Sequence, residues 1–403
     1  MTVATIVGGA SFALVHKIAP HLAPGEYSIF TTLIQVVNGV TLAAMGFQIV
    51  LAKVVAETLT EQARLDAAAA ARGVLLLASG FWLLLVMAVI ASGGSFRSWV
   101  GAVGAWPWVW LSGTALCLLF QSTCLGVLQG SQDFLWFGAI SILSGAGRLL
   151  FVWVLVAGFG LAVTGAMAGV FAASLLCAAV AGWRTRSAVT LPGGAYRWKE
   201  LAQRCLFLVC GVGTLSLLLS LDQLMSRRYL RPAEMDFYAV AGTIGRVVVL
   251  ITVPLTNVMF PKVARSMAED SRPAAFVHAL ALVGLVGVGA ALVCSIFPAL
   301  PIRLLQGNKF LEAAPLVPLF AWAVLPLTLT NILVNNLLAR GRFGVVPLLV
   351  LVTTGYWLFL QASHDSARAI IRALFAFASL ACLVSGVCCW MDRRPGRKSE
   401  GAK

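Results

Sequence analysis

The stretch LAPGEYSIF, residues 22–30, occurs again in altered form as LRPAEMDFY, residues 230–238. The second copy begins 208 residues after the first (230 minus 22). Two further matches follow in the same order and at nearly the same separation: Lys-Val at 53–54 and 262–263, and a weaker match between 128–130 and 339–341. Three ordered matches predict that the chain contains two copies of one structural unit.

Long apolar runs surround the repeated stretches. Of the 403 residues, 60% are hydrophobic and only 11% are charged, whereas a soluble domain carries roughly 25% charged residues. This composition excludes a water-soluble globular protein, and it also excludes a disordered chain, which needs low hydrophobicity. A membrane β-barrel would alternate apolar and polar residues in segments of about ten. The sequence therefore predicts an all-α integral membrane protein.

About twelve apolar runs are long enough to be transmembrane helices. Their approximate bounds are 3–19, 28–52, 73–91, 107–128, 136–157, 161–183, 205–226, 237–260, 275–298, 313–337, 344–361 and 370–391. Each match of the repeat joins corresponding helices, and six helices per repeat preserve the direction of the chain across the membrane. This predicts two parallel six-helix bundles. The predicted units are a first bundle at 1–183, a linker at 184–204, a second bundle at 205–391 and a tail at 392–403.

Basic residues predict the orientation in the membrane. The net charge is +14, and Lys and Arg gather in the linker, which contains Pro192-Gly193-Gly194, and in the tail. Because cytoplasmic loops carry an excess of Lys and Arg, both segments are predicted to be cytoplasmic, with both termini on that side. Nucleic acid is not an expected partner, since topology accounts for most of the positive charge.

Arg148, Asp222 and Arg246 lie in predicted spans at a depth where a charge is costly unless it faces a partner or a cavity. Arg148 lies near the middle of the fifth run, among small residues and without an acid of the first half at its depth. We expect it to line a polar cavity between the halves. Asp222 and Arg246 lie in the seventh and eighth runs. They either form a structural pair between neighbouring helices or contribute to the same cavity.

Amide side chains accompany these charges. The three- and four-residue spacings of Gln35 with Asn38, and of Asn331 with Asn335, place each pair on one helix face. Gln121 and Asn257 lie in the fourth and eighth runs. Each amide alone is explained equally well by hydrogen bonds between helices. Together they predict a polar interior between the halves and complete the set of substrate-binding candidates.

Motifs of catalysis and of metal or cofactor binding are absent from the sequence. It contains no GxxxxGK[ST], HExxH or GxSxG, and its four histidines are scattered. None of its nine cysteines forms a CxxC pair or a Cys/His cluster, and almost all lie in apolar runs, which indicates packing residues. We therefore expect no enzyme, no catalytic residue, no cofactor and no metal.

The repeated stretch resembles a known family. Residues 22–30 resemble the LGPEEYGLF stretch between the first two helices of bacterial polysaccharide flippases, and 126–134 (GVLQGSQDF) is similar to their loop after helix four. Residues 221–265, including PKVA at 261–264, resemble their helix seven to eight unit. The chain is thus similar to oligosaccharide flippases of the O-antigen transporter type, in the multidrug/oligosaccharidyl-lipid/polysaccharide exporter (MOP) superfamily. Its first run, which ends near His16-Lys17, is predicted to be short for this family.

The resemblance implies two six-helix bundles around a central cavity in the bacterial inner membrane. It implies that polyprenyl-pyrophosphate-linked oligosaccharides are moved from the cytoplasmic to the periplasmic leaflet by alternating access. The implied partners are the lipid bilayer, this glycan substrate, a polysaccharide polymerase and glycosyltransferases. Arg148 and Arg246 would bind the pyrophosphate, because guanidinium binds phosphate oxygens in bidentate fashion, while the amides would contact sugar hydroxyls.

Two alternatives stay open at the level of sequence. One is a cation-coupled multidrug or small-molecule antiporter of the same superfamily, which is expected to use an embedded carboxylate in the first half, where no such residue is visible. The other is a membrane scaffold of polysaccharide assembly that transports nothing.

Overall fold

The computed structural model describes residues 2–58, 60–95, 104–247, 249, 274–340, 342–363 and 365–392. Within these ranges the chain is nearly all helical. The elements of the first half are α1 (Thr2–Leu14), η1 (Val15–His21), α2 (Glu26–Ala56), α3 (Glu61–Ala91), α5 (Trp106–Gly130), α6 (Phe134–Trp153), η2 (Val154–Gly158) and α7 (Ala162–Val189). Those of the second half are α8 (Trp198–Tyr229), helical residues 232–247, α10 (Ala274–Ile296), α11 (Ala299–Leu305), η3 (Asn308–Leu316), α12 (Val317–Ala339), α13 (Val345–Ala362) and α14 (Ala367–Asp392).

Ten helices in the described ranges are long and apolar enough to cross a membrane. The sequence predicts two further transmembrane helices. Their places in the chain are occupied by the short helix α1 with η1, and by the helical residues 232–247. The predicted all-α membrane fold is thus confirmed. Some helices are longer than their apolar runs: α3 begins at Glu61, not near 73, and the helix expected from 237 begins at 232. Hydropathy locates the part of a helix in hydrocarbon, and polar turns extend the same helix beyond it.

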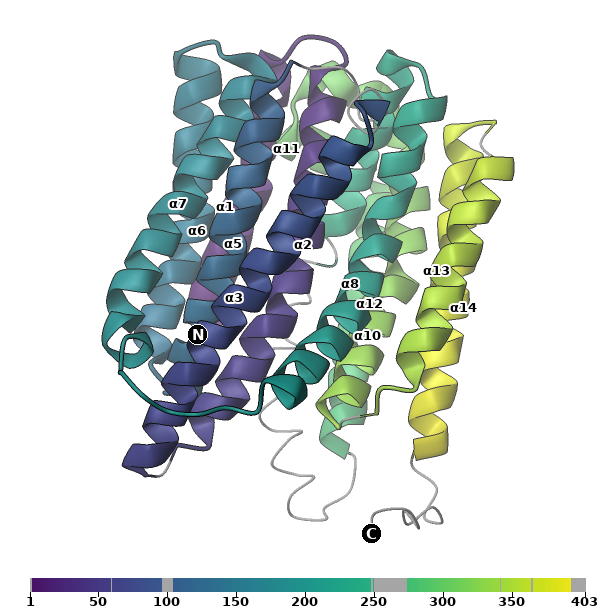
Figure 1. Cartoon of the computed structure of the whole chain (residues 1–403). Coiled ribbons are helices and arrows are strands. Elements are labelled where there is room, and N and C mark those ends of the chain that lie inside the picture. The colour runs from purple at the N-terminus through teal and green to yellow at the C-terminus, as the bar shows by residue number, and fades with distance from the viewer. Residues whose placement is uncertain are drawn as a thin grey trace.

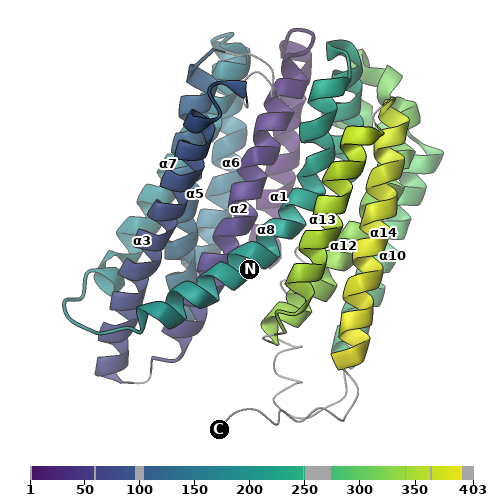
Figure 2. The same ribbon diagram turned by 45° about the vertical axis from the view of Figure 1, so that its right-hand side comes forward.

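The helices stand side by side with their axes roughly along one direction (Figure 1). Turned by 45°, they separate into a group with α3, α5, α6 and α7 and a group with α10, α12, α13 and α14 (Figure 2). Helices α2 and α8 pack against each other and join the two groups. Most of the buried apolar side chains form one continuous cluster that includes residues of both halves.

The segment between the two halves is shorter than predicted. Helix α7 continues to Val189 and α8 begins at Trp198, so four of the basic residues expected in the linker, Arg184, Arg186, Lys199 and Arg204, are helical. The Arg72 guanidinium on α3 donates to the carbonyls of Val189, Leu191 and Gly193, with N···O distances of 3.0, 2.6 and 2.9 Å. The connecting segment is therefore fixed to the first half. The unit boundaries at 183 and 205 stay predictions.

Short side chains let the first helices approach one another closely. A Cβ atom on Gly145 of α6 would lie only 2.3 Å from the carbonyl oxygen of Gly8 on α1. Such contacts between small residues are typical of helices packed in membranes, where association depends on close packing. Caps fix where the helices begin: the Asp133 carboxylate accepts from the backbone N–H of Trp136 at the start of α6.

Candidate functional site

The two repeated stretches meet in space at the end of the molecule where α2 begins. The Asp236 carboxylate, from the second copy, accepts hydrogen bonds from two backbone N–H groups of the first copy. Its Oδ2 lies 2.6 Å from the nitrogen of Gly25, and its Oδ1 lies 2.9 Å from the nitrogen of Ser28. Gly25 has a φ of 85°, and this left-handed conformation marks the turn from which α2 begins. In the repeat Ser28 and Asp236 are equivalent positions, so the halves join through equivalent turns.

Side chains of α8 extend this contact along α2. Arg227 donates through Nη1 to the Ser28 hydroxyl at 2.7 Å, and Gln223 donates through Nε2 to the Thr31 hydroxyl, also at 2.7 Å. We call Gly25, Ser28 and Thr31, with Gln223, Arg227 and Asp236, the inter-bundle clamp. Asp236 and Gln223 are buried, so their bonds are shielded from water and strengthened accordingly.

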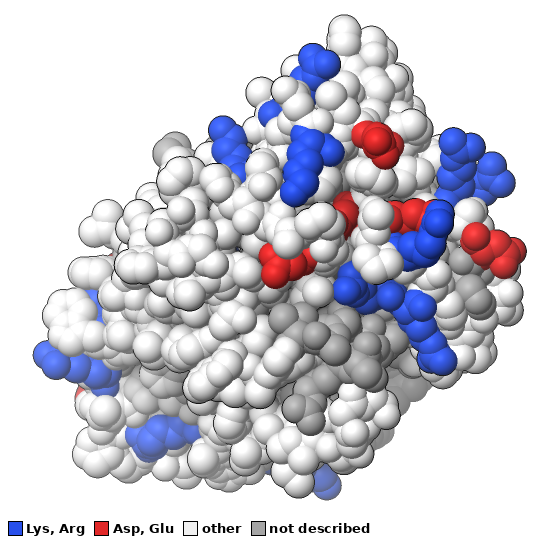
Figure 3. All heavy atoms as spheres, turned by 90° about the horizontal axis from the view of Figure 1, so that it is seen from above, with Lys and Arg blue, Asp and Glu red and all other residues white. Residues whose placement is uncertain are grey.

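A second group of bonds lies beside the clamp. The Tyr27 hydroxyl lies 3.0 Å from Nδ1 of His16 and accepts from Nε2 of Gln306 at 3.1 Å. Lys309 donates to the carbonyl of Leu22 at 3.0 Å. This end of the molecule, seen in Figure 3, carries basic and acidic side chains next to one another. Tyr27, Gln306 and Lys309 therefore also connect the two halves at this end.

Asp222 and Arg246 form a buried ion pair inside the second half. Arg246 Nη2 lies 2.7 Å from both carboxylate oxygens of Asp222, whose side chain is fully buried. The Tyr238 hydroxyl donates to the same carboxylate at 2.8 Å. Arg246 also donates to Gln223 of the clamp and to the carbonyl of Leu219, each at 3.0 Å. The structural pairing considered for these two residues is confirmed, and their contact with a substrate stays a prediction.

Arg148 lies elsewhere than the sequence-based hypothesis placed it. Its guanidinium carbon is 4.7 Å from the centre of the Phe12 ring on α1, and Cys177 of α7 is also a neighbour. The side chain is 4% exposed, and its Nε is buried without a hydrogen-bond partner. In the described part of the chain, no carboxylate lies within 4.0 Å of it. These neighbours put the charge inside the first bundle, because close α1–α6 packing buries that face of α6.

The amide pairs share helix faces as their spacing predicts. Asn38 donates to the Gln35 side chain at 3.3 Å on α2, and Asn335 donates to the side chain and carbonyl of Asn331 on α12. Gln121 is buried on α5, and its Oε1 has no hydrogen-bond partner. Asn257 lies outside the described residues. A substrate role for any of these amides stays a prediction.

The clamp residues were not among the sequence-based candidates. The repeat identified the two turns, but no contact between them was predicted from it. Asp236 directly precedes the apolar run expected from 237, and an acid at the start of a helix ordinarily stabilises that helix alone. An acid at one equivalent position and a short hydroxyl at the other was the available indication of contact.

Comparison with solved structures gives matches over nearly the whole chain. An inward-facing multidrug resistance MATE family transporter of the MOP superfamily superposes with a TM-score of 0.72 and 14% identity, covering 97% of this chain and 95% of that chain. An outward-facing transporter of the same description gives a TM-score of 0.70 and 16% identity, covering 97% and 94%. The chain has the fold of MATE transporters. It is therefore built as MATE transporters are, from two helical bundles.

A further structural neighbour is described by the character of its pocket. It is a MOP superfamily transporter from Pyrococcus furiosus, described as having a binding pocket of reverse polarity that suggests a different function. It superposes with a TM-score of 0.65 and 14% identity, covering 97% of this chain and 94% of that chain. No protein-family model matches the sequence, and no curated protein matches it. The superfamily of the neighbours is the one that the resemblance implied, while the O-antigen flippase type stays a prediction.

Proposed function

We propose that the protein moves an amphipathic small molecule across the membrane by alternating access, as a cation-coupled antiporter of multidrug type. The observation that carries this proposal is the match of nearly the whole chain to MATE transporters in both an inward-facing and an outward-facing conformation. In this respect the comparisons favour the antiporter over the flippase, which the sequence put first.

The inter-bundle clamp supports alternating access. Its bonds join the halves at the end where α2 begins and α8 ends, so opening the molecule at that end requires breaking them. Each of these hydrogen bonds contributes about 1 kcal/mol, and those to charged groups about 1.5–3 kcal/mol. A few such bonds suit a contact that forms and breaks in each transport cycle, since two states must differ by only a few kcal/mol to interconvert.

The flippase remains the second candidate because residues 22–30 and 126–134 resemble stretches of bacterial polysaccharide flippases. Its cargo would be a polyprenyl-pyrophosphate-linked oligosaccharide, and a polymerase and glycosyltransferases would then be its partners. For either function we propose a bacterial inner-membrane protein, from the resemblance to bacterial flippases, with both termini in the cytoplasm, from the basic linker and tail.

Purified protein in proteoliposomes distinguishes the candidates. One set is loaded with ethidium, and its efflux is followed under a proton gradient, a sodium gradient and no gradient. A second set contains a polyprenyl-pyrophosphate oligosaccharide with a fluorescent sugar, whose crossing is measured by chemical quenching from outside. Gradient-dependent ethidium efflux supports the antiporter. Crossing of the labelled glycan without ethidium efflux supports the flippase, and movement of neither favours the scaffold.

A further inference from the structure

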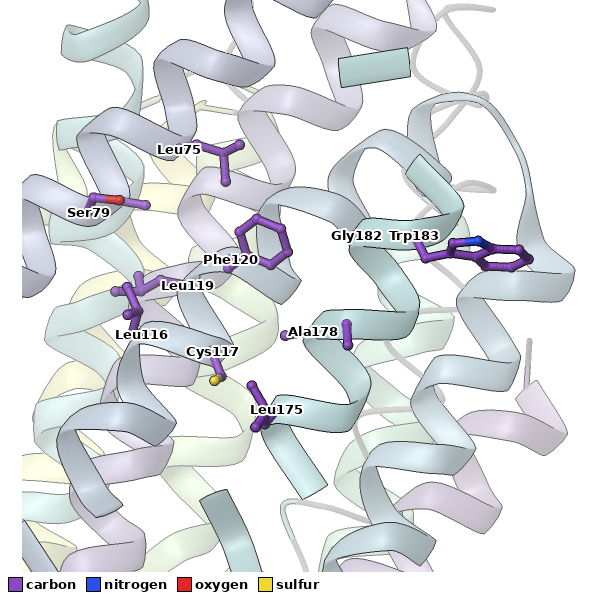
Figure 4. A pocket seen from close by; sticks show the side chains of 12 residues that line it. Leu75, Ser79, Leu116, Cys117, Leu119, Phe120, Leu175, Ala178, Gly182 and Trp183 are labelled. Carbon is purple, nitrogen blue, oxygen red and sulfur yellow. The ribbon is translucent and has the colours of Figure 1, made fainter. Parts of the chain in front are cut away.

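A cavity of about 500 Å³ opens on the side of the first half, between α3, α5 and α7. Figure 4 shows its walls, which are almost wholly apolar. The lining residues include Ser79, Leu116, Phe120, Leu175, Ala179 and Trp183. We call this the lateral groove. A Cβ atom on Gly182 would lie 2.9 Å from the Phe120 ring, so the missing side chain leaves room for this ring in the wall.

The groove lies at membrane depth and opens outward. Its three helices are all long and apolar enough to span a membrane. Leu116, Phe120 and Leu175 on its rim are 37%, 37% and 49% exposed, which places their apolar side chains in contact with hydrocarbon. Because the opening faces the bilayer, a molecule that reaches it from there is hydrophobic, and the acyl chains of lipids are the most abundant such groups. The volume also falls within the range of about 300–1,000 Å³ of pockets that bury small molecules.

The end of the groove near the linker carries a positive charge. Trp183 forms part of the wall there, and Arg186 follows one helical turn later, with its guanidinium carbon 5.8 Å from the centre of the indole ring. Arg184 is already paired with Asp133 at 2.6 Å. Arg186, in contrast, is exposed, and no carboxylate of the described residues lies within 4.0 Å of it. An aromatic ring and an arginine at the end of an apolar groove match the interface of a lipid, where chain and phosphate meet.

We propose that the lateral groove binds one anionic membrane phospholipid, with an acyl chain between α3, α5 and α7 and its phosphate at Arg186. This site is separate from the proposed transport path, because it opens to the side of one bundle. The acyl chain supplies affinity through buried apolar area. Arg186 supplies the preference for a negative headgroup.

Native mass spectrometry of the purified full-length protein, with phosphatidylglycerol or phosphatidylcholine added, tests the site. Wild-type protein is expected to retain one phosphatidylglycerol more tightly than phosphatidylcholine. Ala179→Trp and Ser79→Trp fill the groove from opposite rims, where both side chains are exposed, and are expected to weaken this binding about tenfold or more. Leu176→Trp is the matched control, because Leu176 is exposed on α7 outside the groove.

The headgroup contact is tested with Arg186→Gln, which is expected to remove the preference for phosphatidylglycerol while a lipid is still retained. Lys199→Gln, an exposed cation near the start of α8, is its control and is expected to keep the preference. The proposal is overturned if the two groove-filling variants bind phosphatidylglycerol as wild type does, if Leu176→Trp weakens binding equally, or if wild-type protein retains no lipid. Size-exclusion profiles that match wild type establish that each variant is folded.

Discussion

Asp236→Asn should loosen the contact between the halves without disturbing either half. The carboxylate accepts from the N–H groups of Gly25 and Ser28 at 2.6 and 2.9 Å. An asparagine retains one acceptor oxygen and turns its NH₂ group toward the other donor, so one charge-assisted bond is lost and the other weakened. At about 1.5–3 kcal/mol for a hydrogen bond to a charged group, the separated state should become about ten- to a hundredfold more populated.

Hydrogen–deuterium exchange of the peptide over residues 22–30 measures this directly, because the donors are backbone amides. Exchange at Gly25 and Ser28 should accelerate about ten- to a hundredfold in the variant. Glu234→Gln is the matched control: this acid lies two residues away in the same helix and pairs with Arg231, not with the first half. Unchanged exchange in Asp236→Asn, or equal acceleration in Glu234→Gln, would refute the clamp.

Three other predictions concern the interior of the bundles. Asp222→Ala should lower the free energy of unfolding of the purified protein by about 3–5 kcal/mol, because it leaves the Arg246 cation buried without its partner. The double variant Asp222→Leu/Arg246→Met should recover most of this loss in thermal unfolding. A double variant no more stable than Asp222→Ala would contradict the prediction. Gly145→Ala should lower the free energy of unfolding by about 1–3 kcal/mol, because its Cβ would collide with the α1 backbone. Gly147→Ala, whose Cβ would lie 3.6 Å from its nearest neighbour, should leave stability nearly unchanged. Equal shifts in melting temperature for the two variants would argue against close α1–α6 packing. If Arg148 binds an anionic cargo, transport should fall from wild type to Arg148→Lys to Arg148→Ala at constant membrane abundance, and full transport by both variants would exclude that role.

Much of the fold follows from hydropathy and the internal repeat. Each apolar run became a helix wherever the structure describes it, because a backbone in hydrocarbon has to satisfy its hydrogen bonds within the segment. Helix ends were less predictable. The first turns of α3, from Glu61 to Asp66, are too polar for a hydropathy argument yet continue the same helix, with Thr60 accepting from the N–H of Ala63 as its cap.

Some contacts of the candidate residues were predicted from the sequence and others were not, and there is a physical reason for this division. Spacing along one helix correctly paired Gln35 with Asn38, and the cost of burying charge correctly suggested a partner for Asp222. Both are arguments about single helices or solvation. Asp236 bonds to N–H groups more than 200 residues away, and Arg148 is placed by glycines that pull α1 onto α6, so both positions depend on how the helices pack.

The central claim is that the halves must separate at the clamp during transport, and a reversible cross-link tests it. A Cβ atom on Gly25 would lie 3.5 Å from the Cβ of Pro232, which is within the range that disulfides span. In proteoliposomes, oxidation of the double variant Gly25→Cys/Pro232→Cys should stop ethidium efflux, and reduction should restore it, while each single variant is unaffected by oxidant. Undiminished efflux from fully cross-linked protein would contradict the account.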